Sequence, residues 1–274
     1  MSASVRPADL PDFDDPPVVE TVLSVQFEPL AAMRTAHLGL LWESFRHEFP
    51  NTEERPLLER VLEQFPETPR VRLGLELQTY ENPPVPRVWF TTMQANEMIQ
   101  VQPDRFIKNW RKEGESETYP RYERNKASFE RDFAVFQEFV TANRLGVLRV
   151  NQCEVTYVNH ILSGQGWESF ADAHRVFSFW CPPETRIPGQ PEDMRTHLRF
   201  VIPGKPAPPV GRLHVEVQPA FRAKDGRPMY VFHLTARGQV GESIDFFDLG
   251  RRWIVESFAT LTTPRMHDVW KRKR

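Results

Sequence analysis

Residues 213–237 read LHVEVQPAFRAKDGRPMYVFHLTAR, and this stretch decides the expected fold. Apolar and polar residues alternate on both sides of Asp225-Gly226, a pair that favours a tight two-residue turn between antiparallel strands. The pattern predicts a β-hairpin of residues 213–222 and 229–237 with one apolar and one polar face. The apolar face is the expected core and carries Leu213, Val215, Val217, Phe221, Tyr230, Phe232 and Leu234.

The polar face of this hairpin is the first candidate binding surface. A two-residue turn would pair Gln218 with His233, and the alternation within residues 195–202 adds two further residues to the same face. Antiparallel sheets often have one solvated face. The side chains here are mostly His, Arg, Glu and Gln rather than Thr, Lys and Ser, which favours binding. The surface consists of His197, Arg199, His214, Glu216, Gln218, His233, Thr235 and Arg237.

Outward from the hairpin, the same order of elements is predicted twice. The first set is a strand at 19–27, a helix at 37–49, strands at 71–78, 87–93 and 97–105, and a helix at 122–145. The second is a strand at 149–161, a helix at 167–179, strands at 195–202, 213–222 and 229–237, and a helix at 244–261. We therefore expect an α+β protein built from a duplicated β-α-β-β-β-α unit. Its curved antiparallel sheet would have helices on one face, as in the TATA-binding-protein saddle or a helix-grip fold.

Proline clusters and charge divide the chain. A loose, acidic, proline-rich arm is expected at residues 1–17, the two halves at 18–146 and 147–270, and a basic tail at 271–274. The net charge of -2 argues against a protein built mainly to bind phosphate backbones. No signal-peptide pattern or membrane-spanning apolar run is seen, and two cysteines suit a reducing compartment, so we expect a cytoplasmic protein without a membrane partner.

A second informative stretch runs from Gln100 to Pro120. Asn109-Trp110 and Tyr119-Pro120 are interpreted as a pinned connection between a strand and the following helix, with a structural role. Gln100 is placed within a strand, where alternation pairs it with Thr91 on the polar face. Gln100 is therefore the residue of this stretch that we expect to bind a partner.

The chain also resembles, over nearly its full length, a sporadically distributed family of uncharacterised prokaryotic proteins. Its patchy distribution resembles that of mobile or defence-associated genes, and the resemblance implies no known activity. The residues that carry it are Pro17-Val18-Val19-Glu20, Gln100, Asp104-Arg105-Phe106, Asn109-Trp110, Tyr119-Pro120, Tyr122, Tyr157-Val158-Asn159-His160, Leu261-Thr262, His267 and Trp270.

The expected function is non-catalytic: a binding or regulatory protein that holds a protein partner on the polar sheet face. One alternative is a nucleic-acid-binding saddle that uses Arg72, Arg199, Arg237 and the basic tail. Another is a small-molecule or hydrolytic enzyme whose acid and base come from Glu20, Glu154, His214 or His233. No cofactor motif is found, and no metal site is expected, because His214 and His233 are not opposite one another in the predicted register. The oligomeric state is left open.

Overall fold

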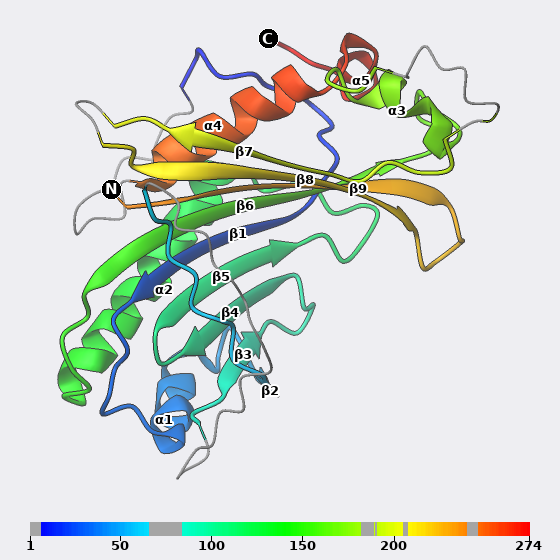
Figure 1. Cartoon of the computed structure of the whole chain (residues 1–274). Coiled ribbons are helices and arrows are strands. Elements are labelled where there is room, and N and C mark those ends of the chain that lie inside the picture. The colour runs from blue at the N-terminus through cyan, green and yellow to red at the C-terminus, as the bar shows by residue number, and fades with distance from the viewer. Residues whose placement is uncertain (1–6, 66–83, 182–188, 190, 205–207, 240–245) are drawn as a thin grey trace.

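The computed structural model describes residues 7–65, 84–181, 189, 191–204, 208–239 and 246–274. Within them, nine strands form one open sheet in the order β2-β3-β4-β5-β1-β6-β9-β8-β7, and every neighbouring pair is antiparallel (Figure 1). The strands are β1 (Val18–Phe27), β2 (Asn51–Arg55), β3 (Arg87–Thr91), β4 (Glu97–Gln102), β5 (Arg105–Arg111), β6 (Val150–Leu162), β7 (Thr196–Ile202), β8 (Gly211–Phe221) and β9 (Pro228–Gly238). The predicted α+β class and the antiparallel sheet are confirmed.

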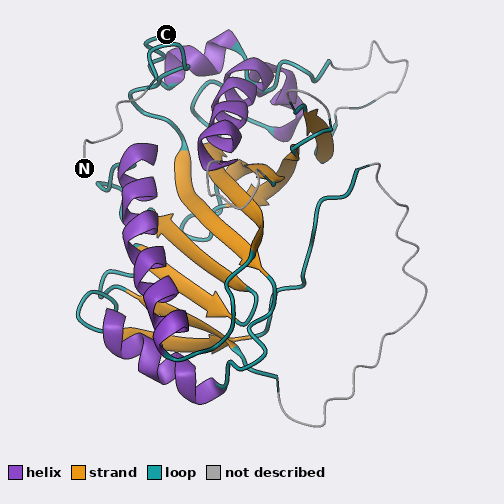
Figure 2. Ribbon diagram, turned by 90° about the vertical axis from the view of Figure 1, so that its left-hand side faces the viewer, coloured by secondary structure: helices purple, strands orange, loops and turns teal. Residues whose placement is uncertain are grey.

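The helices lie on one side of this sheet, as Figure 2 shows. They are α1 (Thr35–Phe45), α2 (Tyr122–Ala142), α3 (Ala173–Val176) with a preceding 3-10 turn (Phe170–Asp172), α4 (Phe246–Leu261) and α5 (Pro264–Val269). Among the described helices, none combines the length and apolar composition needed to cross a membrane.

Helix α2 shows how the core is specified. Phe129, Phe133 and Phe136 recur at helical spacing, and all three are buried. Their rings surround Phe106 of β5, with ring centroids 5.2 to 5.7 Å apart. This stripe therefore fixes α2 against the middle of the sheet.

On both sides of the central β1–β6 pair, the strands follow in the same order of chain position. Outward from β1 the sheet continues β5-β4-β3, and outward from β6 it continues β9-β8-β7. Each half thus contributes one central strand followed, further along the chain, by three strands that fill its side. The edge strand β2 is an addition on the first side. Whether the halves are a duplicated unit stays a prediction, as does the likeness to a saddle or helix-grip fold.

The strands of the first half depart from the predicted elements. Residues 97–105 were predicted as one strand, but β4 ends at Gln102 and a new strand, β5, runs over Arg105–Arg111. Asn109 and Trp110 therefore lie in an interior strand, and their interpretation as a strand-to-helix connection is wrong. The strand predicted at 71–78 lies outside the described residues. In the second half, the helix predicted at 167–179 is limited to the 3-10 turn and α3.

The predicted hairpin of β8 and β9 exists, but its register differs by two residues. Residues 222–227 form the connection, in which the backbone N–H of Arg222 donates to the Arg227 carbonyl at 2.8 Å. Glu216 consequently pairs with His233 and His214 with Thr235. A shift of two residues preserves the face on which each side chain lies, because the period of a strand is two. The predicted core residues are buried except Phe221, which is 64% exposed near the end of the hairpin.

The described part of the N-terminal segment, residues 7–17, packs against the helices, which differs from the loose arm expected. Leu10 and Phe13 are buried. Phe13 forms a β-bridge with Arg272, and Lys273 pairs with Asp14 at 2.5 Å. An ion pair therefore joins the acidic segment to the basic tail.

Candidate functional site

The face of the sheet opposite the helices carries a chain of hydrogen bonds across four strands. Gln100 of β4 accepts hydrogen bonds from Arg87 Nη1 at 2.7 Å and from Trp89 Nε1 at 2.9 Å. Its own amide donates to Asn109 Oδ1 of β5 at 2.8 Å, and Asn109 Nδ2 donates to Glu20 Oε1 of β1 at 2.6 Å.

This network explains the spacing of Gln100 and Asn109. The two residues occupy neighbouring strands and bond directly, and Gln100 lies opposite Trp89 rather than the predicted Thr91. Gln100 and Asn109 are 6% and 3% exposed. Their hydrogen bonds therefore lie beneath the exposed side chains of this face. Trp110 and Tyr119 lie on the helix side instead, with ring centroids 5.6 Å apart. Pro120 precedes Arg121. Arg121 is the residue before α2, and its φ is 73°.

The same open face is crossed by a segment of the chain itself, residues 56–65, which we call the strap. It leaves β2 and passes over the strands as the light-blue thread in front of the sheet in Figure 1. Its contacts run from β4 through β6 to β8 and β9. The strap thus spans both halves of the sheet.

Two buried glutamines bind the backbone of the strap in the same way. Gln102 Oε1 accepts from the Leu58 N–H at 3.0 Å while its Nε2 donates to the Leu58 carbonyl at 3.2 Å. Gln152 Oε1 accepts from the Glu63 N–H at 2.8 Å while its Nε2 donates to the Val61 carbonyl at 2.6 Å. A primary amide that serves one N–H and one C=O recognises extended backbone regardless of side chain.

The side chain of Glu63 anchors the far end of the strap. Its carboxylate pairs with Arg212, lies 2.6 Å from Nε2 of His214 and 3.5 Å from Nη1 of Arg237. Glu63 and Arg212 are 6% and 8% exposed at their side chains. The Arg212 guanidinium also covers the ring of Phe65 at 4.6 Å. We call Arg212, His214 and Arg237 the carboxylate clamp.

Electrostatics favour an ionised carboxylate in the clamp. Burial by itself would raise the pKa of Glu63, but the hydrogen bond and electrostatic interaction with His214, together with the charges of Arg212 and Arg237, hold that pKa below its ordinary value. Arg237 also donates from Nε to Glu154 Oε2 at 2.5 Å. The clamp therefore favours the ionised form of the Glu63 carboxylate.

The predicted face residues divide into two groups. His214 and Arg237 contact Glu63, whereas Arg199 and Gln218 are exposed and Glu216 keeps 44% of its side chain accessible. His197 stacks on His214 with ring centroids 5.9 Å apart. His233 is half-buried, and this burial lowers its pKa.

Four residues of this site were not predicted from the sequence: Glu63, Arg212, Gln102 and Gln152. The alternation that selected His214 also places Arg212 on this face, but the strand was taken to begin one residue after it. No local pattern connects residues 56–65 with strands that lie up to 174 positions further along the chain.

The residues named for catalysis are engaged with different partners. Glu20 contacts Asn109 and Arg111, Glu154 contacts Arg237, and His214 contacts Glu63. Within the described residues, no three His, Cys, Asp or Glu side chains are grouped so as to hold a metal ion. Of the arginines named for nucleic acid, Arg72 lies outside the described residues and Arg237 is paired with carboxylates.

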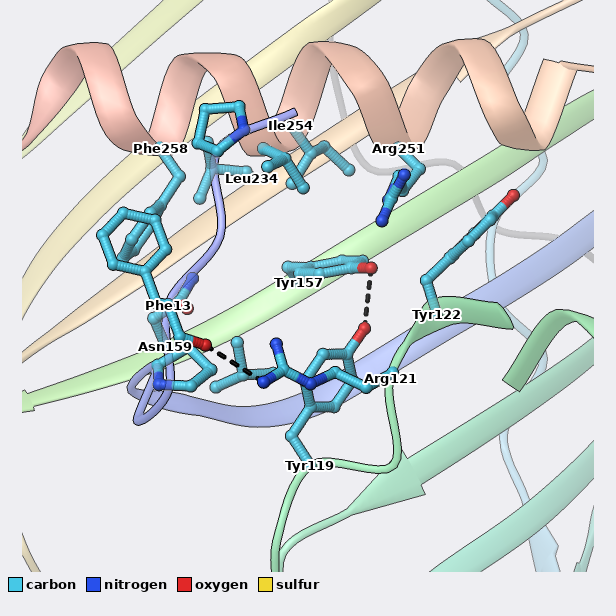
Figure 3. Close-up of a pocket in the computed structure, with 14 residues that line it drawn as sticks. Phe13, Tyr119, Arg121, Tyr122, Tyr157, Asn159, Leu234, Arg251, Ile254 and Phe258 are labelled. Atoms are coloured by element: carbon cyan, nitrogen blue, oxygen red, sulfur yellow. Dashed lines mark hydrogen bonds between the residues drawn. The ribbon is translucent and has the colours of Figure 1, made fainter. Parts of the chain in front are cut away.

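A separate pocket lies on the helix face, between β6, α4 and the N-terminal segment (Figure 3). Its volume is about 50 Å³. The hydroxyls of Tyr119 and Tyr157 share a hydrogen bond of 2.8 Å at one end, and Arg251 of α4 points toward them. Burial and the neighbouring Tyr157 raise the pKa of Tyr119, which keeps its phenol protonated. Apolar side chains form the other walls: Pro11, Phe13, Pro16, Val18, Leu234, Ile254, Val255 and Phe258.

Comparison with known proteins adds no relative: no family model matches the chain, and no curated protein or solved structure is found to be similar to it. The resemblance to a sporadic prokaryotic family stays a prediction.

Proposed function

We propose that this chain is a non-catalytic binding protein of the prokaryotic cytoplasm that holds an extended, acidic segment of a protein partner on its open sheet face. The observation that supports this most directly is the strap. An extended peptide already occupies the face, with its backbone on Gln102 and Gln152 and its Glu63 carboxylate in the clamp. A partner segment with the same chemistry would take the place of the strap.

The two kinds of contact have different roles in recognition. Amide pairs on the backbone supply affinity for any extended segment, whereas the carboxylate clamp supplies selectivity, because a buried charge-assisted contact discriminates strongly against a neutral side chain. The strap competes as a tethered ligand, and a short tether gives an effective concentration of about the millimolar range. The strap therefore sets the minimum affinity that a partner segment needs in order to displace it.

The finer features of the proposal come from the sequence. The two halves would be copies of one β-α-β-β-β-α unit forming a saddle-like sheet, and the patchy distribution of the resembled family suggests a mobile or defence-associated gene set. His197 and Arg199 of β7 lie beside His214, and Glu216 and Gln218 follow it along β8. These four side chains would contact the partner beyond its central segment.

A peptide supplied in trans tests the proposal. The probe is a fluorescent decapeptide of residues 56–65, PLLERVLEQF, and the receptor is the full chain carrying Glu63→Ala, which weakens its own strap. We expect saturable binding, with weaker binding to the wild-type chain because the intact strap competes. A peptide with Gln in place of the second Glu should bind at least about tenfold more weakly.

The same peptide identifies a genuine partner. A protein captured from host extract by the Glu63→Ala chain should be released by PLLERVLEQF and retained when the Gln peptide is added. Failure of the trans peptide to bind, or equal binding of the Glu and Gln peptides, would contradict the proposal. Nucleic acid is excluded as the ligand if low-salt mobility shifts of DNA and RNA show no complex.

A further inference from the structure

Three arginines lie together on the open face where the strap begins. Their guanidinium carbons surround the ring of Trp89, at 4.3 Å from its centroid for Arg55 and at 5.6 Å for both Arg87 and Arg111. Arg55 is the last residue of β2 and lies opposite Arg87 in the ladder with β3, and Pro56 follows it as the first residue of the strap. Like charges in opposite positions of a ladder repel one another, and a nearby anion relieves that repulsion.

Two of these arginines already have a carboxylate partner. Arg55 pairs with Glu53 at 2.8 Å. Arg111 pairs with Glu20 at 3.0 Å. Within the part of the chain that the structure describes, no carboxylate forms an ion pair with Arg87. Arg87 is therefore the member of this cluster whose positive charge has no anion beside it.

The contacts of Arg87 hold it against the first residue of the strap. Its Nη1 donates to Gln100 Oε1 at 2.7 Å, and its Nε donates to the carbonyl oxygen of Pro56 at 3.1 Å. Both acceptors are neutral. Burial lowers the pKa of Arg87, and the charges of Arg55 and Arg105 lower it further. The surroundings therefore oppose the charge of Arg87, and a carboxylate at the position of Pro56 would stabilise it.

We propose that the partner segment carries an acidic residue seven positions before the glutamate that enters the clamp, and that this acidic residue pairs with Arg87. The inference rests on the proposed function, because the partner segment is taken to follow the path of the strap from Pro56 to Glu63, which are seven positions apart. When the strap leaves, Arg87 loses the Pro56 carbonyl as an acceptor. A carboxylate of the partner would replace it with a charge-assisted hydrogen bond, which is stronger than a bond to a neutral carbonyl.

Arg105 also donates to the backbone of the strap, but its electrostatic surroundings differ from those of Arg87. Its Nη2 donates to the Glu59 carbonyl at 3.1 Å. Burial lowers the pKa of Arg105, and the carboxylates of Glu154 and Asp104 act in the opposite direction. Arg105 therefore already has carboxylates nearby. This contrast confines the inferred acidic position to the start of the partner segment, opposite Arg87.

Variants of the full chain test this site without any partner. Pro56→Asp places a carboxylate beside Arg87 within the strap itself, and Pro56→Asn is its neutral counterpart of the same shape. We expect Pro56→Asp to unfold at a higher urea concentration than Pro56→Asn. Adding Arg87→Gln to both should abolish this difference, whereas Arg124→Gln, which removes an exposed charge from α2, should preserve it. Equal midpoints of the two Pro56 variants, or a difference that persists with Arg87→Gln, would overturn the inference.

Peptides supplied in trans test the same position in the partner segment. The probes are the N-acetylated decapeptides DLLERVLEQF and NLLERVLEQF, and the receptor is the full chain carrying Glu63→Ala. The Asp peptide should bind at least about threefold more tightly, as expected for one partly exposed ion pair, and Arg87→Gln in the receptor should remove this advantage. Equal binding of the two peptides would contradict the acidic position alone. Failure of both peptides to bind would contradict the proposed function and the inference that rests on it.

Discussion

Glu63 and His214 meet at 2.6 Å on the open face of the sheet although 151 positions separate them in the chain. The contact joins a segment that follows an edge strand of the first half to β8 in the second half. The Glu63 side chain is nearly buried. The strap is therefore packed onto the clamp as part of the folded structure, unlike an exposed surface loop.

Replacing the charge of Glu63 should destabilise the fold. Glu63→Gln keeps the shape of the side chain but leaves Arg212 and His214 without their anionic partner, and we expect a loss of about 1–3 kcal/mol in the free energy of unfolding. Urea denaturation measures this. Glu53→Gln removes a half-exposed carboxylate from β2 and should change stability by no more than ~0.5 kcal/mol. Equal stability of both variants would mean that the clamp contributes nothing to folding.

The difference between the wild-type chain and Glu63→Gln should depend on pH. The pKa of Glu63 is lowered in the folded state, so its stabilising contribution is fully present above the ordinary carboxyl pKa of 4.5. The contribution is lost as pH falls through the folded pKa, because the carboxyl becomes protonated. Unfolding curves from neutral pH down to acid should therefore converge for the two chains. Curves that stay parallel below pH 4.5 would contradict this assignment.

Neighbouring residues of the polar face should respond differently to alanine. Arg237 is 20% exposed at its side chain and contacts both Glu154 and Glu63, so Arg237→Ala should cost about 1–3 kcal/mol, because Glu154 loses its partner and Glu63 keeps only Arg212 and His214. Glu216 is 44% exposed, so Glu216→Ala should cost no more than ~0.5 kcal/mol. Thermal melting of both single variants provides the measurement. Similar melting temperatures would show that Arg237 is merely solvated.

Trp110 should be a stability residue. It is 5% exposed in β5 and packs against Tyr119, so Trp110→Ala leaves a large cavity and should cost about 3–5 kcal/mol. Trp89→Ala is the matched control, because Trp89 is only half-buried and lies among arginines on the open face. If Trp110→Ala melts like the parent but loses a ligand, Trp110 is a contact residue instead.

The bond between Gln100 and Asn109 should appear as a coupling energy. In a double-mutant cycle with Gln100→Leu and Asn109→Leu, we expect the two losses to be non-additive by about 1 kcal/mol, because either single change breaks the same hydrogen bond. Gln100→Leu combined with Glu216→Ala serves as the control, since β4 and β8 are not neighbours. Additivity in both cycles would mean that the amide–amide bond contributes no stability.

Local periodicity explains the parts of the fold that could be predicted from the sequence. Alternation in β8 and β9 identified the buried face, and it did so despite a two-residue error in register, because such a shift returns every side chain to the same face. The phenylalanine stripe of α2 likewise needs only the helical period. Both signals are contained within one or two adjacent elements.

Strand β5 was missed because its stability depends on distant partners. Lys108 and Asn109 are polar and favour a loop when read locally, yet both are buried in the middle of the sheet. Lys108 pairs with Asp132 and donates to Ser128 Oγ of α2 at 2.6 Å, while Asn109 joins Gln100 and Glu20. Satisfied buried polar groups override local propensity, and those partners exist only in the folded chain.

The sequence by itself determined that this protein has an antiparallel sheet with one apolar and one polar face, because a side chain's face follows from its position in a strand. Only the tertiary structure decided what lies on the polar face. The strap is held by Gln102, Gln152 and the clamp, and its contacts join residues 31 to 174 positions apart. The physical reason is that hydrogen bonds and ion pairs act between groups brought together in space, and no periodic pattern in residues 56–65 encodes that meeting.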